Sequence, residues 1–592
     1  ITVSNVNDAP TVTSTIVTPW ATAGNAYSYT FTASDVDSGD TLTYAATTIP
    51  SWLNFNSSTG VLSGTPSASD IGGPYVALTA TDSAGAVVTQ SFNIMVRSPE
   101  FQINTYTAGQ QSNVSMAKLA DGGFIVTWMS EAQETSGYGI FGQRYDERGQ
   151  PSGSEFHINT YTDNKQAFPS VTGLEGGGFV ATWVSYEQVS GTDDDIYGQI
   201  YDASGSAVGS EFNINTHTAG EQTFPSISSL TGGGFIVTWA SDQQDGDSWG
   251  VYGQLYDASG NTVASEFRVN TYTTGGQAYN GEVSSTGLSN GNFVITWAGQ
   301  GSGDTLGVWG QLYDSSGNTL GLNYRYNDTT SEGQSDPAIS ALANGKFVVT
   351  WTSAHSDGLD GVDLYGRIWT TTGSDSNPTP GAEFLINSFS TGGQQQSAVT
   401  SLSGGGFVVT WQSPQQDGSG YGIFGQRFDG IGNKIGSEFQ INTTTDYEQS
   451  NVSVVDWADN GFAVSWISYN QDGDSYGIYG QLFDGNGTPI GPYNYFSTGT
   501  SGDDFLVAEA YDNLYGKAGN DTLTGSSGDN YLIGGRGSDT ITTGGGNDRV
   551  LLRAGDGGNS LADADTITDF TDGSDVIGLD INMYGGLSYS DL

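Results

Sequence analysis

The sequence predicts an all-β protein of three successive parts, and three patterns carry this prediction. Residues 1–98 alternate apolar and polar side chains in short runs between turn clusters. Residues 99–497 repeat one aromatic phrase seven times, and residues 498–592 repeat a nine-residue frame six times. We therefore expect a β-sandwich, then a seven-bladed β-propeller, then a parallel β-roll.

The alternation in the first part is clearest in residues 27–32, and turn residues fill segments such as 56–60. Its motifs are Asn-Asp-Ala-Pro at 7–10, the acidic run at 35–40, Ser-Trp-Leu-Asn-Phe at 51–55, Gly-Thr-Pro at 64–66 and Thr-Asp-Ser-Ala-Gly at 81–85. In this order they resemble a bacterial cadherin-like Ig module. The resemblance implies a calcium site at a module junction, and the alternative is that its residues only cap turns. The implied ligands are Asp8, Asp35, Asp37 and Asp82.

The middle part repeats variants of Gly-Phe-(Ile/Val)-Val-Thr-Trp at intervals of 54 to 60 residues. Each repeat holds four strand-like runs, which is typical of a propeller blade. Residues 101–104 before the first repeat and 492–496 after the last are both suited to complete blade seven, and the sequence leaves the choice open. The repeated tryptophans, expected to pack between blades, are Trp128, Trp183, Trp239, Trp297, Trp351, Trp411 and Trp466.

A polar residue recurs in the third strand of each repeat, and we expect it to hydrogen-bond backbone groups between blades. These residues are Gln143, Gln199, Gln254, Gln311, Arg367, Gln426 and Gln481. A second recurrence is an Asn with a Gln seven residues later, in the link between blades, and so fixed a spacing predicts a structural link. The pairs are Asn104 and Gln111, Asn159 and Gln166, Asn215 and Gln222, Asn270 and Gln277, Asn327 and Gln334, Asn387 and Gln394, and Asn442 and Gln449.

Long loops are expected on one face of the propeller, because the links between blades and the loops from second to third strand open on the same side. The opposite face has tight glycine turns, so ligand binding is expected on the long-loop face. Its acidic tips suggest calcium ligands at Asp245, Asp247, Asp472 and Asp474, although Asp-Gly is also an ordinary turn pair. Its aromatic tips suggest ligand contacts at Tyr138, Trp249, Tyr421 and Tyr476.

The last part places Asp or Asn at the sixth position of each nine-residue frame and an apolar residue at the eighth. The pattern resembles the RTX parallel β-roll, which implies Ca²⁺ held between turns and an apolar core. An acidic chain with so small a core is expected to fold only with calcium. The predicted calcium residues are Asp503, Asp512, Asp521, Asn530, Asp539 and Asp548, and the core residues are Phe505, Leu514, Leu523, Leu532, Ile541 and Val550. The segment 564–577 resembles the cap that follows RTX repeats.

Composition excludes several classes of function. The chain has 592 residues, 15 Lys plus Arg against 64 Asp plus Glu, and a formal charge of -49, so no nucleic-acid partner is expected. It has no Cys, hence no disulfide or thiolate zinc site. No long apolar run predicts a membrane span, and no N-terminal signal stands out. The resemblance to RTX proteins implies export by type I secretion. Residues 1–8 resemble the last strand of a preceding module, so we expect the sequence to be part of a longer protein.

Known RTX proteins include enzymes, so catalytic motifs were sought. The only histidines are His157, His217 and His355, without a His-Glu-x-x-His pattern, and no Gly-x-Ser-x-Gly occurs. A carboxylate-pair glycosidase or a lyase stays open, because a propeller can bring such groups together at its central channel. The expectation is nevertheless that the chain is not an enzyme and has no catalytic residues.

The order of the three parts resembles the distal end of a large bacterial RTX adhesin. The resemblance implies a secreted or cell-surface protein that acts as a monomer within a longer chain and depends on calcium. Its propeller is expected to bind a glycan or protein of a cell surface or matrix. A secreted carbohydrate-active enzyme and a structural spacer are the two alternatives.

Overall fold

The computed structural model is all-β, with no α-helix among the residues it describes. The described residues therefore include no helix that is long and apolar enough to cross a membrane. The structure describes residues 7–579 apart from 15–19, 25, 38, 68–69, 71–73, 98–99, 135–136, 148, 189–192, 279–282, 331, 355–360, 372–377, 458–459, 491–495, 499–501, 509–512, 527–529, 546–547, 553–563 and 572–574.

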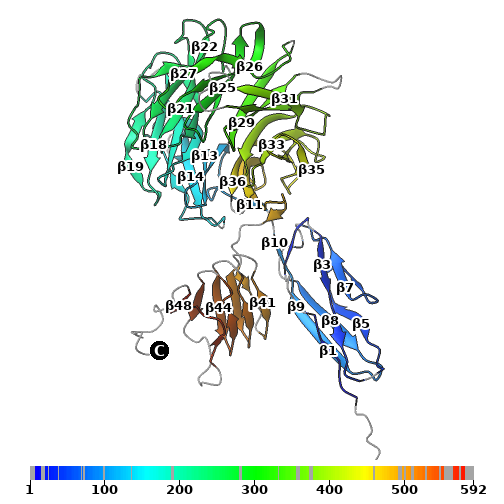
Figure 1. The fold of residues 1–592 in the computed structure, drawn as a ribbon. Helices are drawn as coiled ribbons and strands as arrows, with labels where there is room; N and C mark the ends of the chain where they lie inside the picture. Colours follow the sequence, from blue (N-terminus) through cyan, green and yellow to red (C-terminus); the bar gives the residue numbers. More distant parts are fainter. Residues whose placement is uncertain are drawn as a thin grey trace, which may run out of the picture. The chain divides into compact units, whose positions relative to one another are not determined.

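The first part is a β-sandwich of short antiparallel strands, as the alternation predicts (Figure 1). A short parallel pair, β2 and β10, accompanies its two larger sheets. One sheet has the order β3 (Tyr27–Thr30), β7 (Val61–Gly64), β6 (Leu53–Asn56), and the other β5 (Thr43–Thr48), β8 (Tyr75–Thr81), β9 (Val87–Asn93). The remaining strands are β1 (Thr11–Val12), β4 (Ala33–Ser34), β2 (Trp20–Thr22) and β10 (Met95–Arg97).

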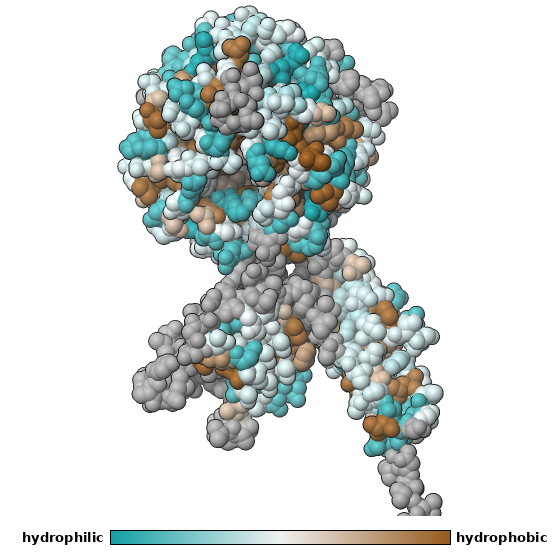
Figure 2. Space-filling model, in the orientation of Figure 1, coloured by the Kyte–Doolittle hydropathy of each residue, from teal (hydrophilic) through white to brown (hydrophobic). Residues whose placement is uncertain are grey.

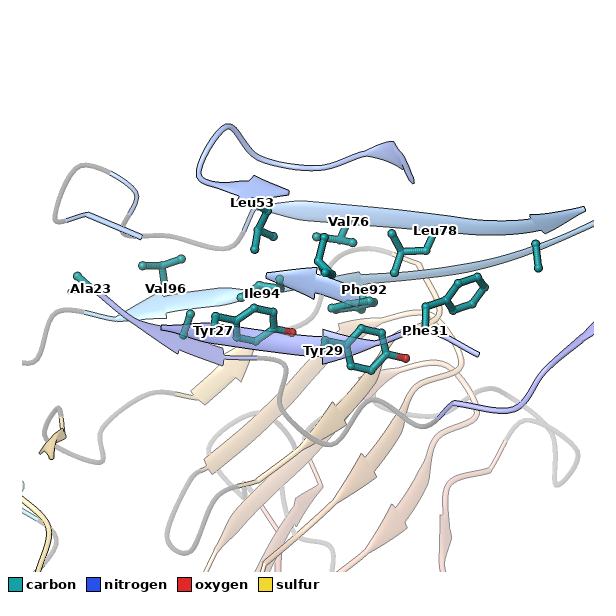
Figure 3. Close-up of a cluster of buried hydrophobic side chains, with 13 residues drawn as sticks. Ala23, Tyr27, Tyr29, Phe31, Leu53, Val76, Leu78, Phe92, Ile94 and Val96 are labelled. Carbon is teal, nitrogen blue, oxygen red and sulfur yellow. The ribbon is translucent and has the colours of Figure 1, made fainter. Parts of the chain in front are cut away.

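The core of the sandwich lies between these sheets. Figure 3 shows Tyr27 and Tyr29 of β3 beside Val76 and Leu78 of β8, with Phe31 at one end. Phe31, Val76 and Leu78 have no exposed surface. Leu53 and Leu62 are buried in this core, whereas Trp52 and Phe55 are partly buried and pack against it. The alternation of the sequence therefore identifies the buried face of the strands.

The second part consists of seven successive antiparallel sheets, one for each repeat (Figure 1). Innermost strands of neighbouring blades contact one another, and the first also contacts the last, so the ring closes. The first three blades are β12 (Gln111–Lys118), β13 (Phe124–Glu134), β14 (Gly137–Tyr145), β15 (Phe156–His157); β16 (Gln166–Gly173), β17 (Phe179–Tyr186), β18 (Asp194–Tyr201), β19 (Ala207–Asn213); and β20 (Gln222–Ser229), β21 (Phe235–Asp242), β22 (Trp249–Tyr256), β23 (Phe267–Arg268).

The other blades repeat this plan, and the compact unit that contains them runs from Glu100 to Ile490. Blades four to seven comprise β24 (Val283–Gly287), β25 (Phe293–Gly301), β26 (Asp304–Tyr313), β27 (Thr319–Arg325); β28 (Gln334–Leu342), β29 (Lys346–Ser353), β30 (Asp363–Thr370), β31 (Thr379–Leu385); β32 (Gln395–Ser401), β33 (Phe407–Pro414), β34 (Tyr421–Phe428), β35 (Lys434–Gln440); and β36 (Gln449–Trp457), β37 (Gly461–Tyr469), β38 (Tyr476–Phe483) with β11 (Glu100–Gln102) and β39 (Pro489–Ile490).

The outer strand of blade seven is built from both ends of the propeller. Strand β39 pairs with Leu482 and Phe483 of β38, and β11 pairs with the preceding residues of β38, from Tyr479 to Gln481. The ring of blades is therefore closed by an outer strand that comes partly from β11 and partly from β39, which answers the question that the sequence left open. Of the two candidates named from sequence, 101–104 contributes, while 492–495 lies outside the described residues and Phe496 belongs to the roll.

The recurrent residues differ in how well their roles were predicted. All seven repeated tryptophans are buried, and six of them have less than 2% of their surface exposed. Five of the six recurrent glutamines donate to carbonyls of their own blade, which corrects the expectation of bonds between blades, and the amide of Gln481 has no hydrogen-bond partner among the described residues. Gln143, for example, donates to the carbonyls of Arg144 at 2.8 Å and Gly153 at 3.1 Å. Arg367 does bridge blades, because it donates to the carbonyl of Tyr326 at 2.8 Å and pairs with Asp328.

The third part is a roll of two parallel sheets that the chain visits alternately (Figure 1). Its core is a column formed by Leu514, Leu523, Leu532, Ile541 and Val550, each without exposed surface. One sheet has β40 (Phe496–Thr498), β42 (Asn513–Ala518), β44 (Tyr531–Arg536), β46 (Arg549–Leu552) and β48 (Val576–Leu579), and the other β41 (Phe505–Val507), β43 (Thr522–Thr524), β45 (Thr540–Thr542) and β47 (Thr566–Ile567).

The first turn of the roll departs by one residue from the predicted frame. Phe505 was expected in the core but is 41% exposed, and Leu506 is buried in its place. The pairing of β41 with β43 aligns Leu506 with Leu523, which makes this turn one residue shorter than the next.

Candidate functional site

The two kinds of long loop meet on one face of the propeller, as the loop lengths predicted. Asp474, in the loop between the second and third strands of blade seven, accepts a hydrogen bond from the backbone N of Gly109 at 3.1 Å. Asp247 does the same for Gly275 at 3.0 Å. Both glycines lie in links between blades. In space filling, hydrophobic residues on the visible surface of the propeller are scattered among hydrophilic ones (Figure 2).

The Asn and Gln of each link form the structural unit that their spacing predicted. The amide of Asn270 donates to Oε1 of Gln277 at 2.9 Å, and its Oδ1 accepts from the backbone N of Val251 at 2.8 Å. Asn327 repeats the contact to Gln334 at 2.7 Å. Both members are buried in all seven blades, and the Asn amide donates to its Gln in four of them, at Asn104, Asn270, Asn327 and Asn442. In blades two and three the Oε1 of Gln166 and of Gln222 accepts from the indole of Trp183 and of Trp239 instead. Buried amides with hydrogen bonds inside the protein thus fix these links.

An acidic side chain completes this unit, a role that the sequence analysis did not foresee. The amide of Asn270 also donates to Asp245 at 3.1 Å, and the corresponding acids in other blades accept from their own Asn. The predicted calcium ligands Asp245, Asp247, Asp472 and Asp474 therefore have protein hydrogen bonds, and calcium at these tips stays a prediction. The acids that bond the link Asn are Glu134, Asp195, Asp245, Asp304, Asp363, Asp417 and Asp472.

The four predicted aromatic contacts occupy equivalent places on this face. Tyr138, Trp249, Tyr421 and Tyr476 each pair with a residue of the second strand at the loop end of the hairpin. All four side chains are half-buried. The scaffold thus presents one aromatic side chain at the same position in blades one, three, six and seven.

Two carboxylates lie near the loop end of blade two. Asp194 pairs across the hairpin with Tyr186, and Glu221 ends the link into blade three. Burial raises the pKa of Asp194 to about 6, and repulsion from Glu221 adds to this effect. Asp194 is half-buried whereas Glu221 is exposed. The two acids thus sit in different environments.

The two histidines that the structure describes, His157 and His217, have different surroundings. His157 contacts Glu134 and stacks on Phe141. His217 lines an open groove of about 740 Å³ together with Glu266. His355 lies outside the described residues.

The sandwich brings three aspartates together. Carboxylate oxygens of Asp35, Asp37 and Asp40 lie within 4.8 Å of one another, and no other group of three such side chains occurs among the described residues. Asp8 joins them through its backbone N, which donates to Asp37 at 2.7 Å. Asp82 accepts from the amide of Asn7 at 2.8 Å. Asp40, which was not chosen from the sequence, is therefore part of the cluster.

The roll carries a ladder of carboxylates from turn to turn. The backbone N of Asp504 donates to Asp521, and the backbone N of Asp521 donates to Asp539, each at 2.8 Å. On the other side, the backbone N of Asn530 donates to Asp548 at 2.7 Å. Asp504 thus takes the place expected for Asp503, which is exposed, and Asp512 lies outside the described residues.

The roll offers the donors that Ca²⁺ prefers. Asp521 is 1% exposed and its Oδ2 has no hydrogen-bond partner among the described residues. A Cβ on Gly516 would lie 2.2 Å from that oxygen and 2.4 Å from the carbonyl oxygen of Gly534, so carboxylate and carbonyl converge on a bare glycine. Burial raises the pKa of Asp521 to about 6, with the charges of neighbouring aspartates contributing. These residues fit a bound calcium ion, which would supply the missing positive charge.

The cap continues the roll rather than covering it. The backbone N of Asp539 donates to Asp565 at 3.0 Å, and that of Asp548 donates to Asp575 at 3.1 Å. Strands β47 and β48 pair in parallel with β45 and β46. Asp565 and Asp575 thus extend both ladders. The nine-residue spacing did not predict this, because residues 553–563 interrupt it.

Two segments of the chain match family models. Residues 9–97 match the family described as "Putative Ig domain", and residues 515–550 match the RTX calcium-binding nonapeptide repeat in four copies. The Ig-like domain and the RTX repeats flank the propeller in sequence, as the resemblance to RTX adhesins implies. RTX repeats bind calcium and are characteristic of extracellular proteins exported by type I secretion. No curated protein matches the sequence.

Several solved structures are similar to the chain at low identity. A protein of unknown function from Dyadobacter fermentans is 11% identical, with 65% of this chain and 97% of that chain covered and a TM-score of 0.40. The α-L-arabinanase of Penicillium chrysogenum, solved with arabinobiose, is 15% identical, with 54% and 93% covered and a TM-score of 0.38. The β-propeller domain of the Trilobed protease from Pyrococcus furiosus is 9% identical, with 66% and 98% covered and a TM-score of 0.39.

The expectation that the chain is not an enzyme is corrected by this comparison. Arabinan-degrading glycoside hydrolases are among the similar structures. A His-based zinc site and a serine elbow both have local sequence patterns, and the sequence contains neither pattern. A pair of carboxylates contributed by different blades has no such pattern, so its absence from the sequence could not be inferred.

Proposed function

We propose that the chain is the ligand-binding end of a calcium-dependent extracellular adhesin, and that the long-loop face of its propeller binds a glycan or protein of a cell surface or matrix. The observation that carries this proposal is the recurrence of Tyr138, Trp249, Tyr421 and Tyr476 at one position of the scaffold. Half-buried aromatic side chains on a rigid face provide large contact areas at a small cost in conformational entropy.

Calcium serves two parts of the chain in this proposal. In the sandwich, Asp8, Asp35, Asp37 and Asp82 are joined by Asp40 around a junction site. In the roll, calcium binds along the two ladders, so that the chain folds only after it reaches a calcium-rich exterior. The ladder residues proposed as ligands are Asp503 or Asp504 in the first turn, and then Asp512, Asp521, Asn530, Asp539 and Asp548.

The test is a binding screen of the full chain against immobilised glycans and surface proteins, in calcium and in chelator, with release of soluble product followed in parallel. Saturable binding in calcium supports the proposal. Absence of binding to every glycan and protein would contradict it and favour a spacer.

A glycoside hydrolase is the second candidate, and the environments of Asp194 and Glu221 favour it. Glycosidases pair a carboxyl group that stays protonated near neutral pH with one that is ionised. The pKa of Asp194, about 6, brings this carboxyl group closer to the protonated role, and Glu221 is the exposed acid near it. In this role Asp194 would donate a proton to the leaving oxygen while Glu221 acts on the opposite side of the bond.

Product release in the screen, lost in both Asp194→Asn and Glu221→Gln, would support the hydrolase. The matched control is Glu332→Gln, an exposed acid in a link of another blade. Product release that survives both substitutions would remove this pair from the reaction.

A further inference from the structure

In six blades the innermost strand carries a bulge, and the side chain displayed there varies among Asn, Phe, Asp and Gln. In six blades the second residue after the link Gln has a φ between 50° and 55°, a region that residues other than Gly rarely adopt. One extra residue in the innermost strand accompanies it. Because the bulge is repeated, the fold sets the backbone and only the side chain varies. These residues are Asn113, Phe168, Phe224, Asp336, Gln396 and Asn451.

Blades two and three place aromatic rings at this position. The ring centroids of Phe168 and Phe224 lie 4.5 Å apart, and both side chains are half-buried. Holding a bulky residue at positive φ is energetically unfavourable, so the surrounding strands must impose this conformation. The two bulges therefore hold a pair of rings at the wall formed by neighbouring innermost strands.

The ammonium group of Lys165 lies near one of these two rings, that of Phe168, and near two tyrosines. The Nζ of Lys165 is 5.8 Å from the ring centroid of Phe168, 5.2 Å from that of Tyr138 and 5.3 Å from that of Tyr186. Within the described part of the chain it has no carboxylate within 4.0 Å and no side-chain hydrogen bond. Aromatic faces hold the ammonium group by cation–π attraction, and its N–H donors stay available.

Two carboxylates border the same rings. Asp194 is the cross-strand partner of Tyr186, and Glu221 precedes Gln222 as Lys165 precedes Gln166. Burial raises the pKa of Tyr186 to about 12, and the charges of Asp194 and Glu221 add to this, so both acids lie close enough to act on the phenol. The ammonium group of Lys165, which can only donate hydrogen bonds, and the carboxyl groups of Asp194 and Glu221, which offer acceptor oxygens, thus lie near the same ring of Tyr186.

We propose that this cluster, the channel-wall site, binds a neutral sugar residue; its members are Lys165, Phe168, Tyr186, Asp194, Glu221 and Phe224. A sugar hydroxyl both donates and accepts, so it satisfies carboxylates and ammonium together, while the C–H face of the ring packs on the phenylalanines. An anionic ligand would be repelled by the two carboxylates, and an organic cation would compete with Lys165 for the same rings. This inference rests on the proposed ligand-binding function.

The test measures binding of neutral oligosaccharides to the calcium-loaded full chain by calorimetry, with choline and oligogalacturonate as charged probes. Phe224→Asn removes the ring but keeps a residue type that blades one and seven use at this bulge, so the backbone is preserved. The matched control is Gln396→Asn at the bulge of blade six.

Phe224→Asn and Lys165→Gln are each expected to weaken binding of a neutral oligosaccharide at least about tenfold, with Gln396→Asn unchanged. Neutral oligosaccharide binding that is unaffected by Phe224→Asn would overturn the site while leaving the proposed function intact. Tighter binding of choline or oligogalacturonate than of any neutral oligosaccharide would overturn the ligand class. Binding of a protein ligand alone would likewise refute the inference but not the proposed function.

Discussion

Glu100 accepts hydrogen bonds from both the backbone N and the hydroxyl of Thr443, at 2.7 Å and 2.8 Å, although 343 residues separate them. Glu438 in blade six makes the equivalent bond to the backbone N of Ser388 at 2.6 Å. The chain segment that enters the propeller therefore reproduces the contact that an internal outer strand makes to the blade before it. Closure of the ring depends on residues from both of its ends.

Replacing Glu100 with Ala is expected to lower the free energy of unfolding of the propeller by about 2 kcal/mol, because the backbone N and the hydroxyl of Thr443 lose a buried carboxylate acceptor. Glu438→Ala is the matched comparison within a continuous outer strand, and a similar loss is expected there. Chemical denaturation monitored by tryptophan fluorescence measures both. A Glu100→Ala protein as stable as the wild type would show that β11 does not close the ring.

The link between blades three and four gives a second prediction. Asn270→Ala removes the bonds to Asp245, Gln277 and the backbone at once and is expected to cost about 3 kcal/mol. Thr274→Ala, an exposed change in the same link, is expected to stay within about 0.5 kcal/mol of the wild type. Thermal denaturation of both variants compares them, and equal stabilities would contradict a structural role for the buried amide.

Calcium removal is expected to unfold the roll and spare the propeller. The carboxylate ladders repel one another without a cation, whereas the propeller has large apolar clusters between its blades. Hydrogen exchange in chelator should become fast in residues 513–552 and stay slow in the strands of residues 111–483. Asp521→Asn should produce part of this effect in calcium. Undiminished protection of 513–552 in chelator would refute the prediction.

The raised pKa of Asp194 predicts the direction in which the stability of the folded protein changes with pH. Its folded pKa, about 6, lies above the ordinary value of 3.8, so the folded state binds the proton more tightly than the unfolded state. The contribution of Asp194 to stability is therefore present below about pH 4 and is lost as the pH rises through 6. Relative to the wild type, Asp194→Asn should gain stability between pH 4 and pH 7. A difference in melting temperature that is independent of pH would contradict this.

The repeats explain how much of the fold was predictable. The spacing of the tryptophans identified seven blades because each buried ring marks the same strand, and the nine-residue frame identified the column from Leu514 to Val550. Closure could not be predicted, since 101–104 resembles any outer strand and only pairing with β38 distinguishes it. The one-residue slip at Phe505 was hidden for a similar reason, because two adjacent apolar residues satisfy the pattern equally well.

The candidate site was less predictable than the fold. The aromatic tips stood out because they recur at one place, whereas the hydrogen bond that Asp245 accepts from Asn270 could not be predicted from the acidic tip alone. The channel-wall site requires Lys165, Phe168 and Asp194, which lie on different strands, to be brought together by folding. No spacing in the sequence predicts that they are close in space. The positive φ of Phe168 is likewise a property of the folded strand.

The most direct test of the central claim compares the retention of three full-length proteins, in calcium, on the ligand identified by the binding screen. The account predicts that Trp249→Ala binds at least about tenfold more weakly than the wild type, because the long-loop face loses an aromatic contact. Ile431→Ala removes a side chain that is 71% exposed, in a turn between the third and fourth strands of blade six, and should bind as the wild type does. Unchanged binding by Trp249→Ala together with weakened binding by Ile431→Ala would contradict the assignment of the binding face.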